Sequence, residues 1–393
     1  MPDRMTRDEV RTALALSAVF FMRMMGLFMV LPVLALYVEH LQAATPLLIG
    51  CALGIYGLTQ ASLQIPFGKW SDRVGRRPVI TVGLVVFALG GLVAAASTHI
   101  YAVILGRALQ GAGAVSGATL ALAADLTRPS QRTKTMAIIG VSIGAAFTTA
   151  FLVGPLLDAW FGLRGVFLAG AALGLAALLL LWIAVPTPAA AAAPVEARAA
   201  EGRHTTRELR HLQTSVFFLH LVLAASFVAI PVLLASDLGL PKDRHFELYI
   251  PVLAASVLLI WPLLRSSREH MDRRLFAAAI ACLGVGEALL WLLPARIYPM
   301  AFALTIFFTG FNYLEALLPS WISRAAPSAQ KGSSLGAYAT GQFLGTFVGG
   351  LAGGALAGYV GTHGVFAAAA LVCAGWLVFS LRETGRRPAD AAA

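Results

Sequence analysis

The feature that most restricts the fold of this chain is a series of apolar runs, each long enough to cross a lipid bilayer. A membrane-spanning helix needs about 20 predominantly apolar residues. Charged side chains make up only 12% of the 393 residues, whereas soluble domains carry about 25%. The sequence therefore predicts an all-α integral membrane protein with twelve transmembrane helices, at residues 12–38, 47–67, 78–97, 100–124, 134–156, 164–185, 213–235, 247–264, 275–293, 297–323, 332–358 and 363–381.

The basic residues lie mainly on one side of these predicted helices. The formal net charge of +10 would by itself suit a nucleic-acid partner. However, most of the 29 Lys and Arg residues lie at the N-terminus and in alternate short loops, and only four lie at the opposite ends of the runs: Arg164, Lys242, Arg244 and Arg296. Because positively charged loops stay in the cytoplasm, we expect both termini there, with the lipid bilayer and no nucleic acid as a partner.

The twelve runs form two sets of six, separated by a polar linker. Residues 186–212 contain an Ala/Pro tract and alternating charges, which is typical of a flexible connection. We therefore predict an N-terminal half at 1–185, this cytoplasmic linker, and a C-terminal half at 213–393. Two halves of six helices suggest an internal duplication, in which a central site opens alternately to either side of the membrane.

A short charged loop joins the second and third runs. It reads Gly68-Lys-Trp-Ser-Asp72-Arg73-Val-Gly75-Arg76-Arg77-Pro78, between two segments almost free of charge. A carboxylate in this position needs a cation or a helix N-terminus as its partner, and arginines can hold carboxylates of neighbouring helices through paired hydrogen bonds. We expect Arg76 to pair with Asp125, at the end of the fourth run. The alternative is that these basic residues only set the membrane topology.

This loop and several other segments resemble the major facilitator superfamily of transporters. The loop pattern of that family matches residues 68–77, and the matching helix segments are 29–33, 54–60, 65–68, 107–111 and 314–320. Within the superfamily, the chain is most similar to bacterial YajR-type members of the drug:proton antiporter branch.

The resemblance implies a monomer in the bacterial inner membrane that moves a small-molecule substrate and protons. It implies that the charged loop latches the two halves together on the cytoplasmic side, with Asp72 facing the start of the eleventh helix near Gly332 and Ser333. The similar transporters carry an extra C-terminal domain. Because only twelve residues follow Leu381, we expect no such domain here.

Four charged residues lie inside the apolar runs: Arg23, Arg107, Glu287 and Glu315. A charge at mid-bilayer costs about 2.5–3.5 kcal/mol on insertion scales, so each is a candidate functional residue. Arg107 and Gln110 share a helix face and resemble the fourth-helix motif of proton-coupled superfamily members. Arg107 would then tune a proton-carrying carboxylate. The alternative is a structural arginine bonded to backbone carbonyl groups.

Glu315 is the candidate for the carboxylate that carries protons. Polar residues surround it at helical spacings and form one stripe on an otherwise apolar helix: Thr305, Thr309, Asn312, Pro319 and Ser323. Arg23 would either take part in coupling or simply pair with Glu315 across the halves. Glu287 lies nearer the outer surface, where we expect its side chain to reach solvent by snorkelling.

Uncharged polar residues give further candidates. Tyr56 and Gln60 lie one turn apart on the second run. There they would either line the substrate cavity or form hydrogen bonds between helices. His220 in the seventh run could titrate near neutral pH, with a purely structural role as the alternative.

Glycines at regular spacing predict close helix packing or bending. In the eleventh run Gly345 and Gly349 belong to a series that recurs at intervals of four. The fifth run contains Gly144 and the pair Gly154-Pro155, which resemble the antiporter motif of drug exporters. That motif continues with two glycines where this chain has Asp158 and Ala159, a departure that weakens the assignment to antiport.

Together these features predict a transporter and not an enzyme. The histidines at 99, 220 and 363 are scattered along the chain and the three cysteines lie singly, so neither a catalytic nor a metal site is indicated. The sequence has no phosphate-binding loop, so no nucleotide cofactor is expected. We predict proton-driven export of small amphipathic or aromatic compounds by rocking of the two halves. The alternatives are a proton-coupled importer of a small metabolite and a passive channel.

Overall fold

The computed structural model describes residues 5–37, 40–128, 130–186, 203–265, 273–326 and 331–385. The described part is helical almost throughout. Its elements are α1 (Arg7–Phe28), α2 (Leu31–Leu34), η1 (Ala35–Tyr37), α3 (Pro46–Val74), α4 (Arg76–Ala95), α5 (Ile100–Ala112), α6 (Ser116–Asp125), α7 (Arg132–Ala184), α8 (Arg203–Ser236), η2 (Lys242–Arg244), α9 (Phe246–Arg265), α10 (Arg273–Leu292), α11 (Ile297–Ala325) and α12 (Lys331–Gly385).

The helices account for the twelve predicted spans. Nine stretches of the described residues are helical, long and apolar enough to cross a bilayer. Two of these, within α7 and α12, each contain two predicted spans, and a further span is divided between α5 and α6. The prediction of an all-α membrane protein is therefore confirmed.

Each of the two longest helices folds back on itself at a glycine. Gly162 in α7 has φ 64° and ψ −173°, and Gly361 in α12 has φ 76° and ψ 176°. Only glycine adopts this backbone region readily. The two turns occupy equivalent places, because each lies between the last two spans of its set of six. The first helices of the two sets also share a sequence, Leu-Pro-Val-Leu at 31–34 and Ile-Pro-Val-Leu at 230–233. The halves at 1–185 and 213–393 stay a prediction, and α8 begins at Arg203, inside the linker predicted at 186–212.

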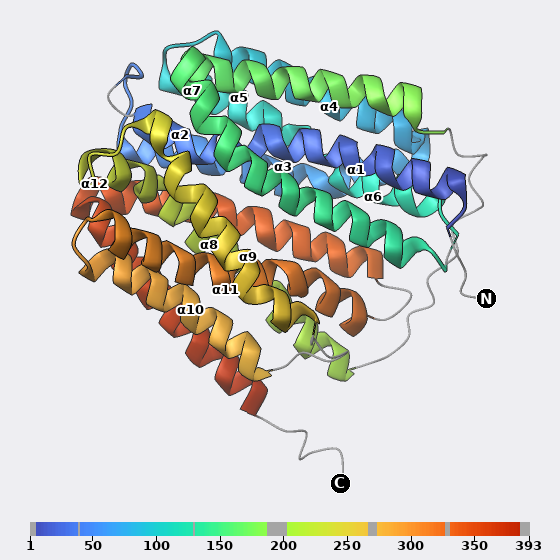
Figure 1. Cartoon of the computed structure of the whole chain (residues 1–393). Helices are drawn as coiled ribbons and strands as arrows, with labels where there is room; N and C mark the ends of the chain where they lie inside the picture. Colours follow the sequence, from blue (N-terminus) through green and yellow to red (C-terminus); the bar gives the residue numbers. More distant parts are fainter. Residues whose placement is uncertain are drawn as a thin grey trace.

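The two sets of helices lie side by side (Figure 1). The helices coloured from blue to green, α1 to α7, occupy the upper part of the view, and α8 to α12 occupy the lower part. Within the first set, α1 and α4 pack along α7, and α3 packs along α5. Within the second set, α8 and α10 pack along α12. The most extensive contact between the sets joins α3 to α12.

Glycines on two faces of α12 allow this close approach. On one face, ideal Cβ atoms at Gly345 and Gly349 would lie 2.2 and 2.1 Å from backbone oxygens of α8. On the other face, Gly350 meets Gly50 of α3, where a Cβ on Gly50 would lie 2.1 Å from the Gly350 oxygen. The predicted small-residue packing of the eleventh span is therefore confirmed.

The glycines of the fifth span behave differently from one another. A Cβ at Gly154, next to the buried Pro155, would lie 2.6 Å from the backbone oxygen of Met29, so this glycine does allow α7 to approach α1. Gly144 meets no atom within 4 Å, and neighbouring Val141 is 74% exposed. The prediction of close packing is therefore wrong at Gly144, because no helix of the described residues lies against this face of α7; the alternative of bending stays a prediction.

Candidate functional site

Arg23 lies at the centre of a polar cluster inside the first set of helices. Its side chain, on α1, is only 1% exposed. Nη1 donates to Ser116 Oγ at 2.9 Å, and Nη2 donates to Tyr56 OH at 3.0 Å, Gln60 Oε1 at 2.7 Å and the Gly113 carbonyl oxygen at 3.1 Å. The Gly113 carbonyl is available because the helix is interrupted between α5 and α6. Four neutral oxygens therefore hold this guanidinium.

Arg107, on α5, lies beside the same cluster and is completely buried. Its Nη1 donates to Gln110 Oε1 at 3.0 Å and its Nε donates to the Ala52 carbonyl oxygen at 3.3 Å. The guanidinium also lies over the Tyr56 ring, 5.0 Å from the ring centroid. Arg107 and Gln110, predicted to share a helix face, thus form a direct hydrogen bond. The contact with the Ala52 carbonyl also agrees with the alternative, a structural arginine bonded to backbone carbonyl groups.

The second set of helices contains a different cluster, built from His220 of α8 and Glu315 of α11. His220 Nε2 lies 3.5 Å from Glu315 Oε2, a contact that becomes an ion pair when the ring is protonated. His220 Nδ1 lies 3.1 Å from the Val216 carbonyl oxygen, and the Gln342 amide nitrogen lies 2.8 Å from His220 Nε2. A carbonyl oxygen can only accept, so Nδ1 carries a proton, and a neutral ring then accepts from Gln342 at Nε2. The side chain of Glu315 is 31% exposed.

This arrangement corrects one alternative and adds one residue. Arg23 does not pair with Glu315, because neutral oxygens surround Arg23 and His220 takes the place beside Glu315. Asn312, on the predicted polar stripe, donates to Ser256 Oγ at 2.8 Å and so links α11 to α9. Gln342 was not predicted. Its only signal in the sequence is a polar side chain within the glycine-rich eleventh span.

The two clusters are close neighbours across the contact between α3 and α12. Tyr56, which holds Arg23, packs edge-to-face against Phe343 with 6.1 Å between the ring centroids. Phe343 directly follows Gln342, the residue that contacts His220. The arginine cluster and the histidine–glutamate pair are therefore linked through one aromatic contact and one step along α12, from Phe343 to Gln342.

Glu287 is not where the sequence placed it. It is completely buried, with its Oε1 at 2.5 Å from Ser226 Oγ of α8. The prediction that it reaches solvent is wrong, because this face of α10 points into the helix bundle. The preceding Gly286 packs against the backbone of Phe307 in α11, which fixes that orientation.

Arg76 and Arg77 of the charged loop contact described residues of the first set of helices. Arg76 Nε lies 3.2 Å from Asp125 Oδ2, which confirms the predicted pair, and Arg76 also forms an ion pair with Asp72. Arg77 donates to the backbone oxygens of Leu181 and Trp182, each at 3.2 Å, and lies over the Trp182 ring. Gly75 has φ 95° and separates α3 from α4.

The remaining positions of the loop are more open. Arg73 is exposed, and Gly68 has no neighbour within 4 Å of an added Cβ. Asp72 has 60% of its side chain exposed. The contact predicted between Asp72 and the side chains at 332 and 333 lies outside the described residues.

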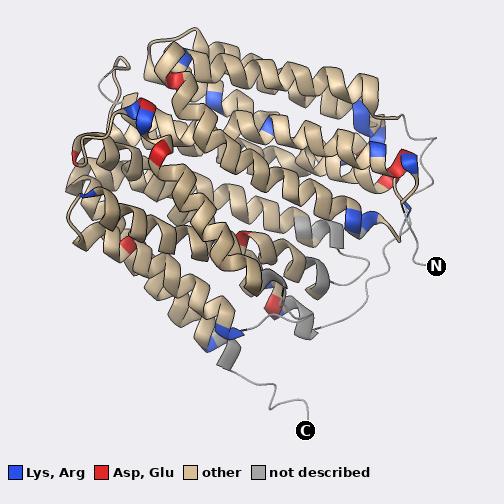
Figure 2. Cartoon of the chain, viewed as in Figure 1, with Lys and Arg blue, Asp and Glu red and all other residues tan. Residues whose placement is uncertain are grey.

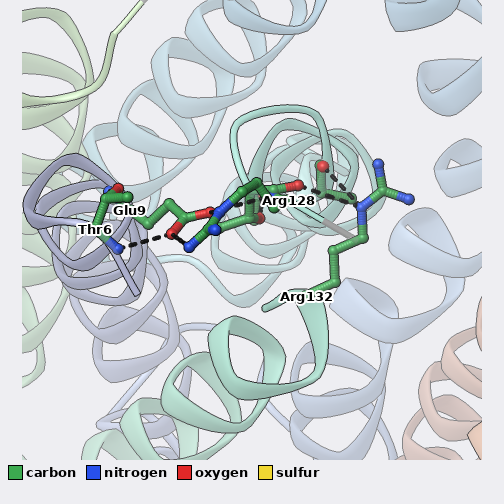
Figure 3. Close-up of polar contacts among 7 residues, drawn as sticks. Thr6, Glu9, Arg128 and Arg132 are labelled. Carbon is green, nitrogen blue, oxygen red and sulfur yellow. Dashed lines mark hydrogen bonds and ion pairs between the residues drawn. The ribbon is translucent and has the colours of Figure 1, made fainter. Parts of the chain in front are cut away.

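A second ionic contact lies at the same end of the first set of helices (Figure 3). Glu9 accepts from Arg128 Nε and Nη2, each at 2.9 Å, and from the Thr6 backbone nitrogen at 2.8 Å. Nearby, Arg132 Nε donates to the Ala124 carbonyl oxygen at 3.1 Å. The hydrogen bonds from Arg128 and Thr6 hold the pKa of Glu9, which precedes the first predicted span, at about 2. This contact therefore stays ionised at neutral pH.

A third contact closes the opposite end of the bundle, between the two sets of helices. Tyr37 OH donates to Asp158 Oδ1 at 2.5 Å, and Lys242 Nζ lies 3.0 Å from Asp158 Oδ2. Lys242 also donates to Tyr37 OH at 3.3 Å, and that oxygen accepts the Leu163 backbone N–H at 2.9 Å. Asp158, only 2% exposed, is the residue that departs from the antiporter motif. It binds a lysine of the other set.

Basic residues are distributed unequally between the two ends (Figure 2). Most of the blue residues lie on the side of the bundle that carries the N and C labels, and a smaller group lies on the side of the third contact. This distribution matches the sequence argument for cytoplasmic termini.

Comparisons with known proteins agree on one family. The sequence pattern of the Major Facilitator Superfamily matches residues 16–311 and 265–393. The chain is 40% identical over 380 residues to the inner membrane transport protein YajR of Escherichia coli K12, covering 95% of this chain and 83% of that protein. It is 28% identical over 360 residues to the multidrug resistance protein MdtH of Aeromonas salmonicida, covering 86% of each.

Two solved structures share the fold. A bacterial homologue of the human lysosomal transporter Spinster, in an inward-facing and occupied conformation, has a TM-score of 0.78 at 12% identity, covering 98% of this chain and 100% of the other. The human organic anion transporter MFSD10 has a TM-score of 0.71 at 18% identity, covering 95% and 99%.

Proposed function

Because the chain belongs to the Major Facilitator Superfamily and is therefore a membrane transporter and not an enzyme, we propose that it exports small amphipathic or aromatic compounds in exchange for protons. Both termini lie in the cytoplasm in this proposal, and the membrane is the bacterial inner membrane. The name of one similar protein, an inner membrane transport protein, supports this location, and the name of another, a multidrug resistance protein, supports export.

The observation that carries proton coupling is the pair of His220 and Glu315. Histidine changes charge near neutral pH, and a carboxylate beside it gains or loses its partner when that happens. The Glu315 side chain is partly exposed, so protons can reach the pair although His220 is buried. The aromatic contact between Tyr56 and Phe343 and the adjacent Gln342 link the pair to the arginine cluster. Binding a proton at this pair changes the local charge by one unit inside the membrane, where such a change is costly unless the helices rearrange.

Contacts at the two opposite ends of the bundle would allow the central site to open alternately to either side of the membrane. Lys242 and Asp158 join the two sets of helices at the outer end. Among the described residues, the side chain of Arg76 contacts Asp72, Ser71 and Asp125 of its own set at the cytoplasmic end. Opening to the outside would break the outer contact and bring the charged loop against α12, as the resemblance implies for its latch.

A proton-coupled importer on the same fold remains the second candidate. One nitrogen of the Arg107 guanidinium, Nη2, is buried without a hydrogen-bond partner, so it has a donor free for a substrate carboxylate. The similarity to a protein named as an organic anion transporter favours the same substrate chemistry. Direction of transport distinguishes this candidate from the exporter.

The test uses everted membrane vesicles that contain the protein, energised so that the lumen is acidic. Small aromatic acids, amines and amides are added while lumenal pH is followed with a fluorescent dye. An exporter exchanges the compound for lumenal protons, so we expect lumenal pH to rise with wild type and to stay constant with Glu315→Gln. The matched control is Glu247→Gln, an exposed carboxylate at the outer end that pairs with Arg244, and it should behave like wild type. Normal proton release by Glu315→Gln would exclude Glu315 as the coupling residue.

A further inference from the structure

Two arginines lie buried in the membrane region with no carboxylate beside them. Arg23 is 1% exposed and Arg107 is completely buried. Among the residues that the structure describes, every hydrogen-bond acceptor of these two side chains is a neutral oxygen, and neither arginine takes part in an ion pair. A guanidinium keeps its charge in proteins, and an uncompensated buried charge is costly. The pair therefore lacks a counterion.

The carboxylates of the other set of helices do not supply it. Glu315 lies beside His220, and Glu287 lies beside Ser226. Asp158, also buried, is taken by Lys242. None of these three carboxylates lies in hydrogen-bond contact with either arginine, so among the described residues no carboxylate neutralises the two arginines.

Several donors of the arginine cluster also have no acceptor. Arg23 Nε, Arg107 Nη2 and Gln110 Nε2 are all buried without a hydrogen-bond partner. A buried donor that makes no hydrogen bond costs about 1–3 kcal/mol. All three unsatisfied atoms are donors, and Gln110 is bonded to Arg107, so the chemistry that suits them is a group that only accepts hydrogen bonds. A carboxylate is such a group.

We propose that the transported substrate is an aromatic organic anion whose carboxylate is bound by Arg23 and Arg107. The inference rests on the proposed function and narrows its substrate class. The neutral partners Tyr56, Gln60 and Ser116 give way to the anion, because hydrogen bonds between two charged groups are roughly twice as strong as neutral ones. The aromatic part of the substrate packs against Tyr56 and Phe343, whose rings already lie together. The same two positive charges repel cations.

The test compares three probes that share one ring system and differ in charge: 2-naphthoate, 2-naphthamide and 2-naphthylmethylammonium. Binding to the purified full chain in nanodiscs is measured by calorimetry, without a proton gradient. We expect 2-naphthoate to bind at least about tenfold more tightly than the other two, since a hydrogen bond to a charged group is the term that differs. Stronger binding of the ammonium, equal binding of all three, or binding of none would overturn the proposal.

Variants locate the site. Arg107→Gln and Arg23→Gln should each weaken 2-naphthoate binding by about tenfold or more, and Arg107→Lys, which keeps the charge, should lose less. The matched control is Arg296→Gln, at an exposed arginine of the outer end, and it should bind like wild type. Equal binding by the Arg107→Gln and Arg296→Gln variants would also overturn the proposal. If 2-naphthoate binds as expected but releases no lumenal protons in vesicles, the coupling mechanism is refuted while the substrate class stands.

Discussion

The close contact between α3 and α12 predicts a large effect of a single methyl group at Gly50. An added Cβ would lie 2.1 Å from the Gly350 oxygen and 2.8 Å from the Gly354 Cα, whereas ordinary contacts begin at 3.4 Å. The two backbones must therefore move apart by about 1.3 Å, the difference between 2.1 and 3.4 Å. Overpacking of this kind costs about 1–3 kcal/mol.

The control has to separate this clash from the general effect of alanine in a helix. Gly144→Ala serves, because Gly144 is also inside a helix but has no atom within 4 Å. Alanine stabilises a helix relative to glycine by up to about 1 kcal/mol, and both variants gain this term. The difference between them therefore isolates the clash.

The assay is thermal unfolding of the purified full chain, followed by tryptophan fluorescence. We expect Gly50→Ala to unfold several degrees below Gly144→Ala, and Gly144→Ala to unfold at or slightly above wild type. Gly349→Ala, whose Cβ would lie 2.1 Å from the Leu221 oxygen within the second set of helices, should also be destabilised. Equal unfolding temperatures for Gly50→Ala and Gly144→Ala would show that the two helices do not touch as described.

Three further predictions concern other parts of the fold. Gly162→Ala should lower stability by about 1–3 kcal/mol, measured by thermal unfolding, because the backbone there has φ 64° and ψ −173°, a region that alanine avoids. Lys242→Gln removes the ionic partner of Asp158 and should open the outer end of the bundle. In a chain without native cysteines, a cysteine that replaces buried Phe151 should then react faster with an impermeant maleimide added outside. An unchanged reaction rate would contradict this prediction. Glu9→Gln should lower the unfolding temperature by the same amount from pH 6 to 8 and by less only in strong acid, because the folded pKa of about 2 lies below the usual 4.5 and the contribution is lost as pH falls towards 2.

Hydropathy was sufficient to predict the helices because crossing a bilayer imposes a minimum length of apolar sequence. It also predicted the turn at Gly162, which lies in the interval between the spans predicted at 134–156 and 164–185. It did not predict the break between α5 and α6 at residues 113–115, which lies inside the run predicted at 100–124. That break is a local backbone event in apolar sequence, so an averaged hydropathy profile does not register it. The φ values that require glycine at 162 and 361 follow from how consecutive helices fold back on each other.

The sequence identified most residues of the candidate site but fewer of the contacts between them. Arg76 and Asp125 were paired correctly because both lie at helix ends on the same membrane side, where topology alone limits the choice of partner. Inside the membrane, contacts depend on the rotation of each helix about its axis, which packing decides. For this reason Arg23 was assigned Glu315 as an alternative partner, and Glu287 was placed near solvent, whereas the structure gives Glu315 to His220 and buries Glu287.

The distribution of buried charge between the two sets of helices restricts how coupling can work. Both sets use the same backbone devices, including the glycine turns at 162 and 361. Their interiors nevertheless differ in sign, since Arg23 and Arg107 lie in the first set and Glu315 in the second. An anion bound by the arginines and a proton bound by the histidine–glutamate pair therefore cannot compete for one group. In the proposed exchange, the two sites communicate through the contact between α3 and α12, where the glycines bring the two backbones together and Tyr56 packs against Phe343, so a movement of one set of helices relative to the other changes how the two sites lie to each other.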